Sequence, residues 1–182
     1  MKEKAKILDQ EGINRAITRI AHEIIEKNKG TGNICLVGIQ RGGVYLAKRL
    51  ASNIKQIEKK DIPVGSLDIA FYRDDLNIRK AQPVVRRTEI SFEVTNLKII
   101  LVDDVLFTGR SIRAAMDAVM ALGRPSAIQL SVLIDRGHRE LPIKADYVGK
   151  NIPTALTETV EVQLEEEGFE DRVILKKVED EK

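Results

Sequence analysis

The most constraining feature of the sequence is a run of four apolar residues, Ile99-Ile100-Leu101-Val102, near the middle of the chain. A short run without polar residues is typical of a strand that is buried on both faces. Residues 34–39 form a similar run, and the mostly apolar residues 128–134 are predicted as a further strand. We expect helices at 44–54 and 111–122, after the first two of these three strands. Strands that alternate with helices predict an α/β fold, with a central parallel sheet flanked by helices.

Composition narrows the protein class further. The 182 residues suit one domain, and a chain without Trp must build its core from aliphatic side chains. The net charge of +2 argues neither for nor against a nucleic-acid partner. The single cysteine, Cys35, excludes an internal disulfide and a multi-cysteine metal site. The N-terminus is charged and no long apolar segment follows it, which predicts a cytoplasmic protein without a transmembrane helix.

Local patterns divide the chain into elements. Asp9 is the expected cap of a first helix, whose apolar face consists of Ile13, Ile17, Ile20 and Ile24. Short strand-like segments are predicted at 64–72, 145–148, 160–164 and 173–178. The segment 73–94 is polar and charged and has no sustained core pattern, which is typical of a lid. We therefore expect a single domain, 1–182, with a flexible lid hairpin at about 72–97 and a small C-terminal hood at about 137–178.

Two carboxylates, Asp103 and Asp104, follow the run at 99–102, at the edge where α/β sheets bind ligands. Carboxylates accept hydrogen bonds from sugar hydroxyls. The next residues, Thr108-Gly109-Arg110-Ser111, begin a predicted helix, whose N-terminal N–H groups and dipole favour an anion. This order predicts a ribose-5-phosphate site. An acidic pair alone could equally bind a cation or remain solvated.

The complete stretch from Ile99 to Ser111 resembles the phosphoribosyl pyrophosphate (PRPP) signature of type I phosphoribosyltransferases. The resemblance implies that fold, ribose contacts from Asp103 and Asp104, and a 5-phosphate held at 108–111. It also implies that Mg²⁺ arrives bound to PRPP, with no direct protein ligand assigned. The implied binding stretch is Asp103, Asp104, Val105, Leu106, Phe107, Thr108, Gly109, Arg110 and Ser111.

The same resemblance implies a diphosphate loop at Gln40, Arg41 and Gly42, after the first apolar strand. Glycine there exposes backbone N–H groups, although Arg-Gly-Gly alone is a generic turn. Many family members carry Thr-Arg-Gly, so Arg41 is shifted by one position. Arg73, at the start of the lid, could close over the pyrophosphate. The implied catalytic residues are Asp103, Asp104, Arg41 and Arg73.

A wider resemblance covers the chain from about residue 7 to 164. The runs Arg136-Gly137-His138-Arg139-Glu140-Leu141-Pro142 and Gly149-Lys150-Asn151-Ile152-Pro153-Thr154 are similar to those of the PyrR family. These proteins are bifunctional pyrimidine-operon regulators and uracil phosphoribosyltransferases. The resemblance implies that uracil and PRPP give UMP and pyrophosphate, with Arg136 and the backbone around Val160 near the nucleotide or base. It also implies a homodimer or higher homo-oligomer.

The family resemblance further implies UMP-dependent binding to the leader mRNA of pyrimidine genes, which attenuates their transcription. The polar face of the first helix carries Arg15, Arg19 and His22, but charge alone would make this a solvated face. Lys27 and Lys144 stand where members often have Arg, so the charge remains without the bidentate fork. The implied RNA-binding residues are Thr18, Arg19, His22, Lys27, Arg139, Lys144 and Lys150.

Two alternatives remain open on the sequence. The chain could be an RNA-binding regulator with weak catalysis, or a purine or orotate phosphoribosyltransferase without an RNA role. The presence of both Asp103 and Asp104 argues against lost catalysis. His138 has no assigned role.

Overall fold

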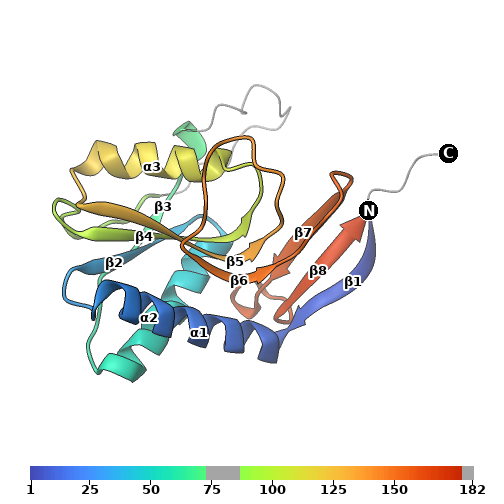
Figure 1. The fold of residues 1–182 in the computed structure, drawn as a ribbon, viewed down its shortest axis with the longest axis horizontal. Coiled ribbons are helices and arrows are strands. Elements are labelled where there is room, and N and C mark those ends of the chain that lie inside the picture. The colour runs from blue at the N-terminus through green and yellow to red at the C-terminus, as the bar shows by residue number, and fades with distance from the viewer. Residues whose placement is uncertain (73–86, 178–182) are drawn as a thin grey trace.

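The computed structural model describes residues 1–72 and 87–177. Its centre is a parallel sheet of five strands in the order β3-β2-β4-β5-β6 (Figure 1). The strands are β2 Ile34–Ile39, β3 Val64–Leu67, β4 Lys98–Leu106, β5 Ala127–Asp135 and β6 Tyr147–Asn151. The predicted central parallel sheet is confirmed.

Helices cover both faces of this sheet. Figure 1 shows α3 (Arg110–Leu122) on one face and α1 (Gln10–Asn28) with α2 (Gly42–Glu58) on the other. Alternate residues of β4 divide between the two layers: Ile99 and Leu101 pack with the α3 cluster, and Ile100 and Val102 with the α1 and α2 cluster. All four are at most 1% exposed. The strand is therefore buried on both faces, as its apolar run predicts.

Helix α1 follows the predicted pattern closely. The Oδ1 atom of Asp9 accepts a hydrogen bond from the Gly12 N–H at 2.8 Å, which caps the helix. Ile13, Ile17, Ile20 and Ile24 are all buried. The helix ends at Lys29, which adopts the left-handed conformation.

Two strands differ in length from the prediction. The expected strand at 64–72 stops at Leu67 and is followed by the 3₁₀ helix η1 (Ala70–Tyr72). Strand β4 continues to Leu106, because β5 extends the pairing beyond Val102, with Asp103 opposite Val132. The acid pair therefore lies within the last part of β4 and not after its end.

A second sheet is antiparallel, in the order β1-β8-β7. Its strands are β1 Lys2–Asp9, β7 Glu158–Gln163 and β8 Arg172–Lys177, with the 3₁₀ helix η2 (Glu165–Glu167) after β7. Figure 1 shows the blue β1 beside the red β8, so the two ends of the chain share one sheet. We call these three strands the hood sheet. The predicted hood at 137–178 differs from it, because β6 joins the central sheet and β1 completes the hood.

The predicted lid lies partly outside the described residues, which exclude 73–86 and therefore Arg73. The segment after the gap returns along β3, where Ser66 and Glu89 exchange backbone hydrogen bonds of 2.9 and 2.8 Å. Within the described ranges, no helix is long and apolar enough to cross a membrane.

Candidate functional site

The acid pair is held by the backbone at the end of β4. The Asp104 N–H donates to Asp103 Oδ1 at 3.0 Å, and the Val105 N–H donates to Asp104 Oδ1 at 2.7 Å. Asp103 is 9% exposed. Burial raises the pKa of Asp104, although the Val105 N–H acts in the opposite direction. Part of Asp104 still reaches solvent, but the surrounding protein desolvates its carboxylate enough to weaken ionisation.

The predicted diphosphate loop lies directly against this pair. The Gln40 N–H donates to Leu67 O at 2.9 Å, and the peptide between Gln40 and Arg41 is cis. A Cβ atom added to Gly42 would lie 2.7 Å from Asp104 Oδ2, and one added to Gly43 would lie 2.2 Å from the Val102 carbonyl oxygen. The absence of side chains at both positions thus lets the loop touch β4 at the acid pair.

Arg41 occupies the start of α2, and its side chain is 63% exposed. Its Nε atom lies 3.7 Å from Glu167 Oε1, in η2 beside the hood sheet. At this distance and exposure the ion pair contributes little free energy, so Arg41 can exchange Glu167 for another anion.

The predicted phosphate cradle begins α3. Gly109 has φ +92°, and the Thr108 Oγ1 atom accepts from the Arg110 N–H at 3.3 Å. Gly109 stands at the N-cap position and supplies no side-chain hydrogen bond to the helix. The Thr108 carbonyl oxygen accepts from the N–H groups of Glu140 (3.0 Å) and Leu141 (3.2 Å), which fixes the turn from behind.

The remaining residues of the signature connect the acid pair to this turn. Val105 and Leu106 complete β4, and Leu106 is buried in the α3 cluster. Ser111 is partly exposed in the first turn of α3, and Arg110 forms an ion pair with Glu140 at 2.6 Å. The structure therefore brings the whole predicted stretch together with the glycine loop at one edge of the sheet.

Arg136, the predicted base contact, is 5% exposed. Its guanidinium group donates to Thr154 Oγ1 at 3.2 Å and to the Glu158 carbonyl oxygen at 2.7 Å. It also lies 4.0 Å from the centre of the Phe107 ring. Burial lowers the pKa of Arg136. This side chain therefore fastens the loop before β7 to the end of β4, and the buried Val160 is available to a ligand only through its backbone.

The predicted RNA contacts on α1 lie on an open groove. It is lined by Glu11, Asn14, Arg15, Thr18, Arg19 and His22. Thr18 Oγ1 donates to Asn53 Oδ1 at 3.0 Å. Arg19 donates to the carbonyl oxygens of Val148 (2.9 Å) and Gly149 (2.7 Å), so it also ties α1 to β6.

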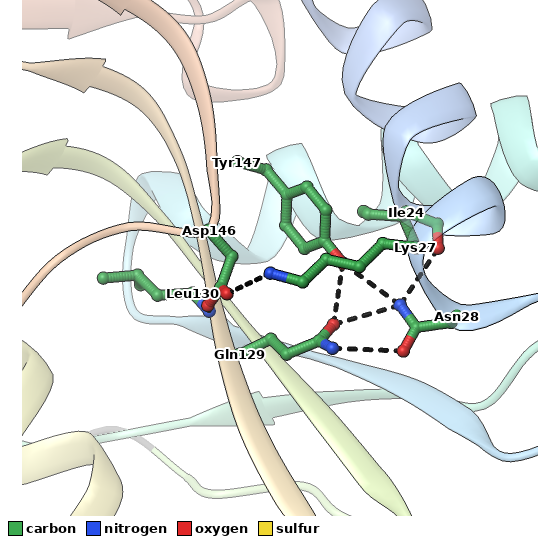
Figure 2. A network of polar contacts seen from close by, with 7 residues as sticks. All are labelled: Ile24, Lys27, Asn28, Gln129, Leu130, Asp146 and Tyr147. Carbon is green, nitrogen blue, oxygen red and sulfur yellow. Dashed lines mark hydrogen bonds and ion pairs between the residues drawn. The ribbon is translucent and has the colours of Figure 1, made fainter.

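Lys27 is held by an acidic partner, as Figure 2 shows. Its Nζ atom lies 2.5 Å from Asp146 Oδ1 and 5.4 Å from the centre of the Tyr147 ring. The other oxygen of Asp146 accepts from the Leu130 N–H at 2.9 Å. Burial raises the pKa of Tyr147 to about 12. Asp146 therefore offsets much of the charge that Lys27 would offer to a phosphate.

Arg139 is bound within the protein. It donates to the carbonyl oxygens of Phe107 (2.8 Å) and Ile143 (3.0 Å) and forms an ion pair with Asp135. These bonds fold the segment after β5 back onto the PRPP signature. They leave little of the guanidinium group for RNA, so the structure favours a supporting role for this residue.

Lys144 and Lys150 are both exposed. Lys150 lines a second depression together with Lys6 and Arg15. Arg15 borders both depressions, so the basic side chains continue from the groove on α1 towards β1.

Sequence reasoning missed Asp146, Glu158 and Lys4. Glu158 accepts hydrogen bonds from the Lys4 ammonium group and from the Ala155 N–H. Asp146 and Glu158 lie more than a hundred residues from their lysine partners, so no local motif marks them.

The described residues contain no group of three or more His, Cys, Asp or Glu side chains that could hold a metal ion. The acid pair could still approach a cation carried by a phosphorylated ligand, since carboxylate oxygens suit Mg²⁺. The donor set fits a metal that arrives with its substrate.

Known proteins resemble this chain along most of its length. Residues 4–167 match the family model described as phosphoribosyl transferase domain. "Bifunctional protein PyrR" of Pelotomaculum thermopropionicum is 63% identical over 174 residues, which cover 96% of each chain. The protein of the same name from Bacillus cereus (strain AH820) is 59% identical over 175 residues, or 95% of this chain and 97% of the relative.

Solved structures agree on the fold. A hypoxanthine phosphoribosyltransferase of Trypanosoma cruzi aligns with a TM-score of 0.73 at 18% identity, over 97% of this chain and 98% of that chain. A hypoxanthine-guanine phosphoribosyltransferase of Bacillus anthracis aligns with a TM-score of 0.71 at 19% identity, over 98% and 100%. These alignments confirm the type I phosphoribosyltransferase fold. On this architecture and on the close relatives, the chain belongs to the phosphoribosyl transferase domain family and, within it, to the PyrR proteins.

Proposed function

We propose that the protein converts uracil and PRPP to UMP and pyrophosphate and that, with UMP bound, it binds the leader mRNA of pyrimidine genes and attenuates their transcription. The observation that carries the enzymatic part is the direct contact between the glycine loop and Asp104. It joins an anion-binding loop and a ribose-binding acid pair into one continuous site. The close PyrR relatives support the regulatory part.

The site residues act on a bond between ribose C1 and the pyrophosphate oxygen. As this bond breaks, positive charge develops on the sugar and negative charge on the leaving group. Asp103 and Asp104 hold the ribose hydroxyls and place negative charge beside the sugar. The backbone N–H groups at Gly42 and the Arg41 guanidinium group face the diphosphate, where preorganised donors stabilise the departing charge. When bound, Mg²⁺ neutralises part of the charge on the diphosphate.

The start of α3 holds the 5-phosphate through its N–H groups and the hydroxyls of Thr108 and Ser111. The uracil lies towards the loop before β7, which Arg136 fastens beside Phe107. A loop whose carbonyl and N–H groups are fixed by Arg136 and Glu158 can read the polar edge of a pyrimidine. Arg136 serves this site by orienting the loop.

The RNA surface is centred on the groove of α1, with Arg15, Thr18 and His22, and continues to Lys150. The exposed Lys144 is assigned to the same surface. A dimer that placed two such grooves on one face would double the positive surface. Phosphate contacts would then make binding strongly dependent on salt.

Two measurements test this function. Pyrophosphate release is followed with uracil, hypoxanthine or orotate as the acceptor. RNA retention on filters is measured with a pyrimidine leader hairpin and a scrambled hairpin, with and without UMP. We expect turnover with uracil and UMP-dependent retention of the leader hairpin. Turnover with hypoxanthine or orotate alone, without RNA retention, would instead identify a different phosphoribosyltransferase, and retention without turnover would identify a regulator that lacks catalysis.

The position of the RNA surface is tested with Lys144→Ala. The matched control is Lys60→Ala, which also removes an exposed charge but lies outside the proposed surface. We expect weaker RNA retention in the first variant only, with pyrophosphate release unchanged in both. Equal retention by both variants would refute the proposed surface.

A further inference from the structure

The N-terminal strand carries an irregularity beside a lysine that contacts a carboxylate on another strand of the hood sheet. The pairing of β1 with β8 shifts register between Glu3 and Ala5, so the residue between them, Lys4, leaves the regular ladder. Such irregularities redirect the side chain of the extra residue. Lys4 thereby reaches Glu158 at the start of β7, the opposite outer strand of the hood sheet, at 2.6 Å.

The two partners of this ion pair differ in exposure. The Lys4 side chain is 55% exposed, but that of Glu158 is only 8% exposed. The Oε2 atom of Glu158 accepts from the Ala155 N–H at 2.8 Å, which closes the turn before β7. A carboxylate so enclosed requires a cationic or N–H partner for each oxygen. Lys4 supplies the partner of one oxygen and the turn supplies that of the other.

The same turn is held from its other side by Arg136, which donates to the carbonyl oxygens of Glu158 (2.7 Å) and Ala155 (3.3 Å). Arg136 also packs on Phe107 of the PRPP signature. The segment 154–158, which we call the clamp loop, is therefore connected to the end of β4 through Arg136 and to the N-terminal strand through Lys4. Arg136 holds the main chain of this loop directly, and Lys4 acts through the Glu158 carboxylate, which accepts from the Ala155 N–H.

We propose that Lys4 is a positioning residue for uracil: through Glu158 it orders the clamp loop against Arg136 and so presets the base site. This inference rests on the proposed function and deepens it. Lys4 lies in β1, far along the chain from the signature, and takes no part in PRPP binding. Its loss should therefore affect uracil and PRPP differently, whereas a purely structural link would affect both substrates and the stability together.

The test compares Lys4→Met with Lys2→Met, which removes the same charge from the same strand without touching Glu158. We expect Lys4→Met to raise KM for uracil about fivefold and to leave KM for PRPP within about twofold. The Ala155 amide should exchange its hydrogen about fivefold faster. Lys4→Arg should restore both values, because the guanidinium group can also reach the carboxylate, and Lys2→Met should match the wild type.

An unchanged KM for uracil in Lys4→Met would overturn the proposal. A parallel rise in both KM values, with a lower melting temperature, would also overturn it in favour of a structural link. If the wild-type protein released no pyrophosphate with uracil, the proposed function itself would fail. The exchange rate of the Ala155 amide would then decide alone whether Lys4 orders the clamp loop.

Discussion

The close approach of α2 to β4 leads to a sharp prediction for Gly43→Ala. A methyl group at this position would lie 2.2 Å from the Val102 carbonyl oxygen, whereas ordinary contact begins at 3.4 Å. The start of α2 must therefore move by about 1.2 Å, the difference between these two distances. The carbonyl group cannot yield easily, because Val102 is paired with strands on both sides.

This shift should affect activity more than folding. Overpacking of this kind typically costs about 1–3 kcal/mol of unfolding free energy. A displacement of about 1 Å in a catalytic constellation can reduce the rate about a hundredfold. The moved loop includes the proposed diphosphate contacts, so kcat/KM for PRPP should fall by about that factor while the protein remains folded.

The assay is uracil-dependent pyrophosphate release over a range of PRPP concentrations, with thermal unfolding measured in parallel. Gly32→Ala is the matched control, since a Cβ atom there would have no atom within 4 Å. The control should retain wild-type kinetics. A Gly43→Ala variant within about twofold of the wild-type kcat/KM would refute the argument that this contact sets the geometry of the site.

Three further predictions concern charges. Asp104→Asn should lower kcat at least about tenfold without loss of stability, because burial already disfavours the charge that catalysis requires. Pyrophosphate release measures the effect on kcat, and thermal unfolding measures the effect on stability. Wild-type turnover in this variant would mean that the carboxylate is structural. Asp146→Asn should tighten binding of the leader RNA, because it frees Lys27 for a phosphate. The slope of log affinity against log salt should become steeper by roughly 0.7–0.9. Filter retention at several salt concentrations measures this slope, and an unchanged slope would contradict the prediction. Arg49→Met should reduce the unfolding free energy by about 3 kcal/mol, because it leaves the carboxylate of Asp171, 2% exposed, without its cation. Burial acts to raise the pKa of Asp171, but Arg49 and the Glu165 N–H together outweigh burial and hold this pKa below 3.8. The stabilisation is therefore present above pH 3.8 and is lost as the pH falls through the lowered pKa. Urea unfolding at pH 7 and pH 3 should show the deficit of the variant shrinking in acid, and an equal deficit at both would count against the assignment.

Local patterns predicted the parts of the fold that depend on neighbouring residues. The apolar run of β4, the cap at Asp9 and the isoleucine face of α1 each follow from a few consecutive positions, and the structure confirms them. Strand β1 was missed because its first five residues, Lys-Glu-Lys-Ala-Lys, are mostly charged and show no strand pattern. It is stabilised by pairing with β8, which lies at the other end of the chain. Single-sequence periodicity contains no information on such a partner.

The same distinction applies to the site. The stretch 103–111 is contiguous, so its chemistry could be read from the sequence and its residues lie together in the structure. The internal partners of Lys27 and Arg139 could not be foreseen, because Asp146 and the Phe107 carbonyl oxygen reach them through tertiary packing. A basic side chain in a sequence predicts a positive charge. Whether that charge is available to an RNA phosphate depends on which carboxylates and carbonyl groups lie beside it in the folded protein.

The hood sheet has a consequence for the order of events during synthesis. Strand β1 is synthesised before the other described strands, but its only described neighbour in the sheet, β8, is the last described strand to be made. The central sheet can assemble while translation continues, whereas the hood must wait for β8. A ribosome that stalled before residue 172 would release a protein with its PRPP signature complete and its N-terminal strand unpaired. Such an unpaired strand edge favours aggregation until β8 is made.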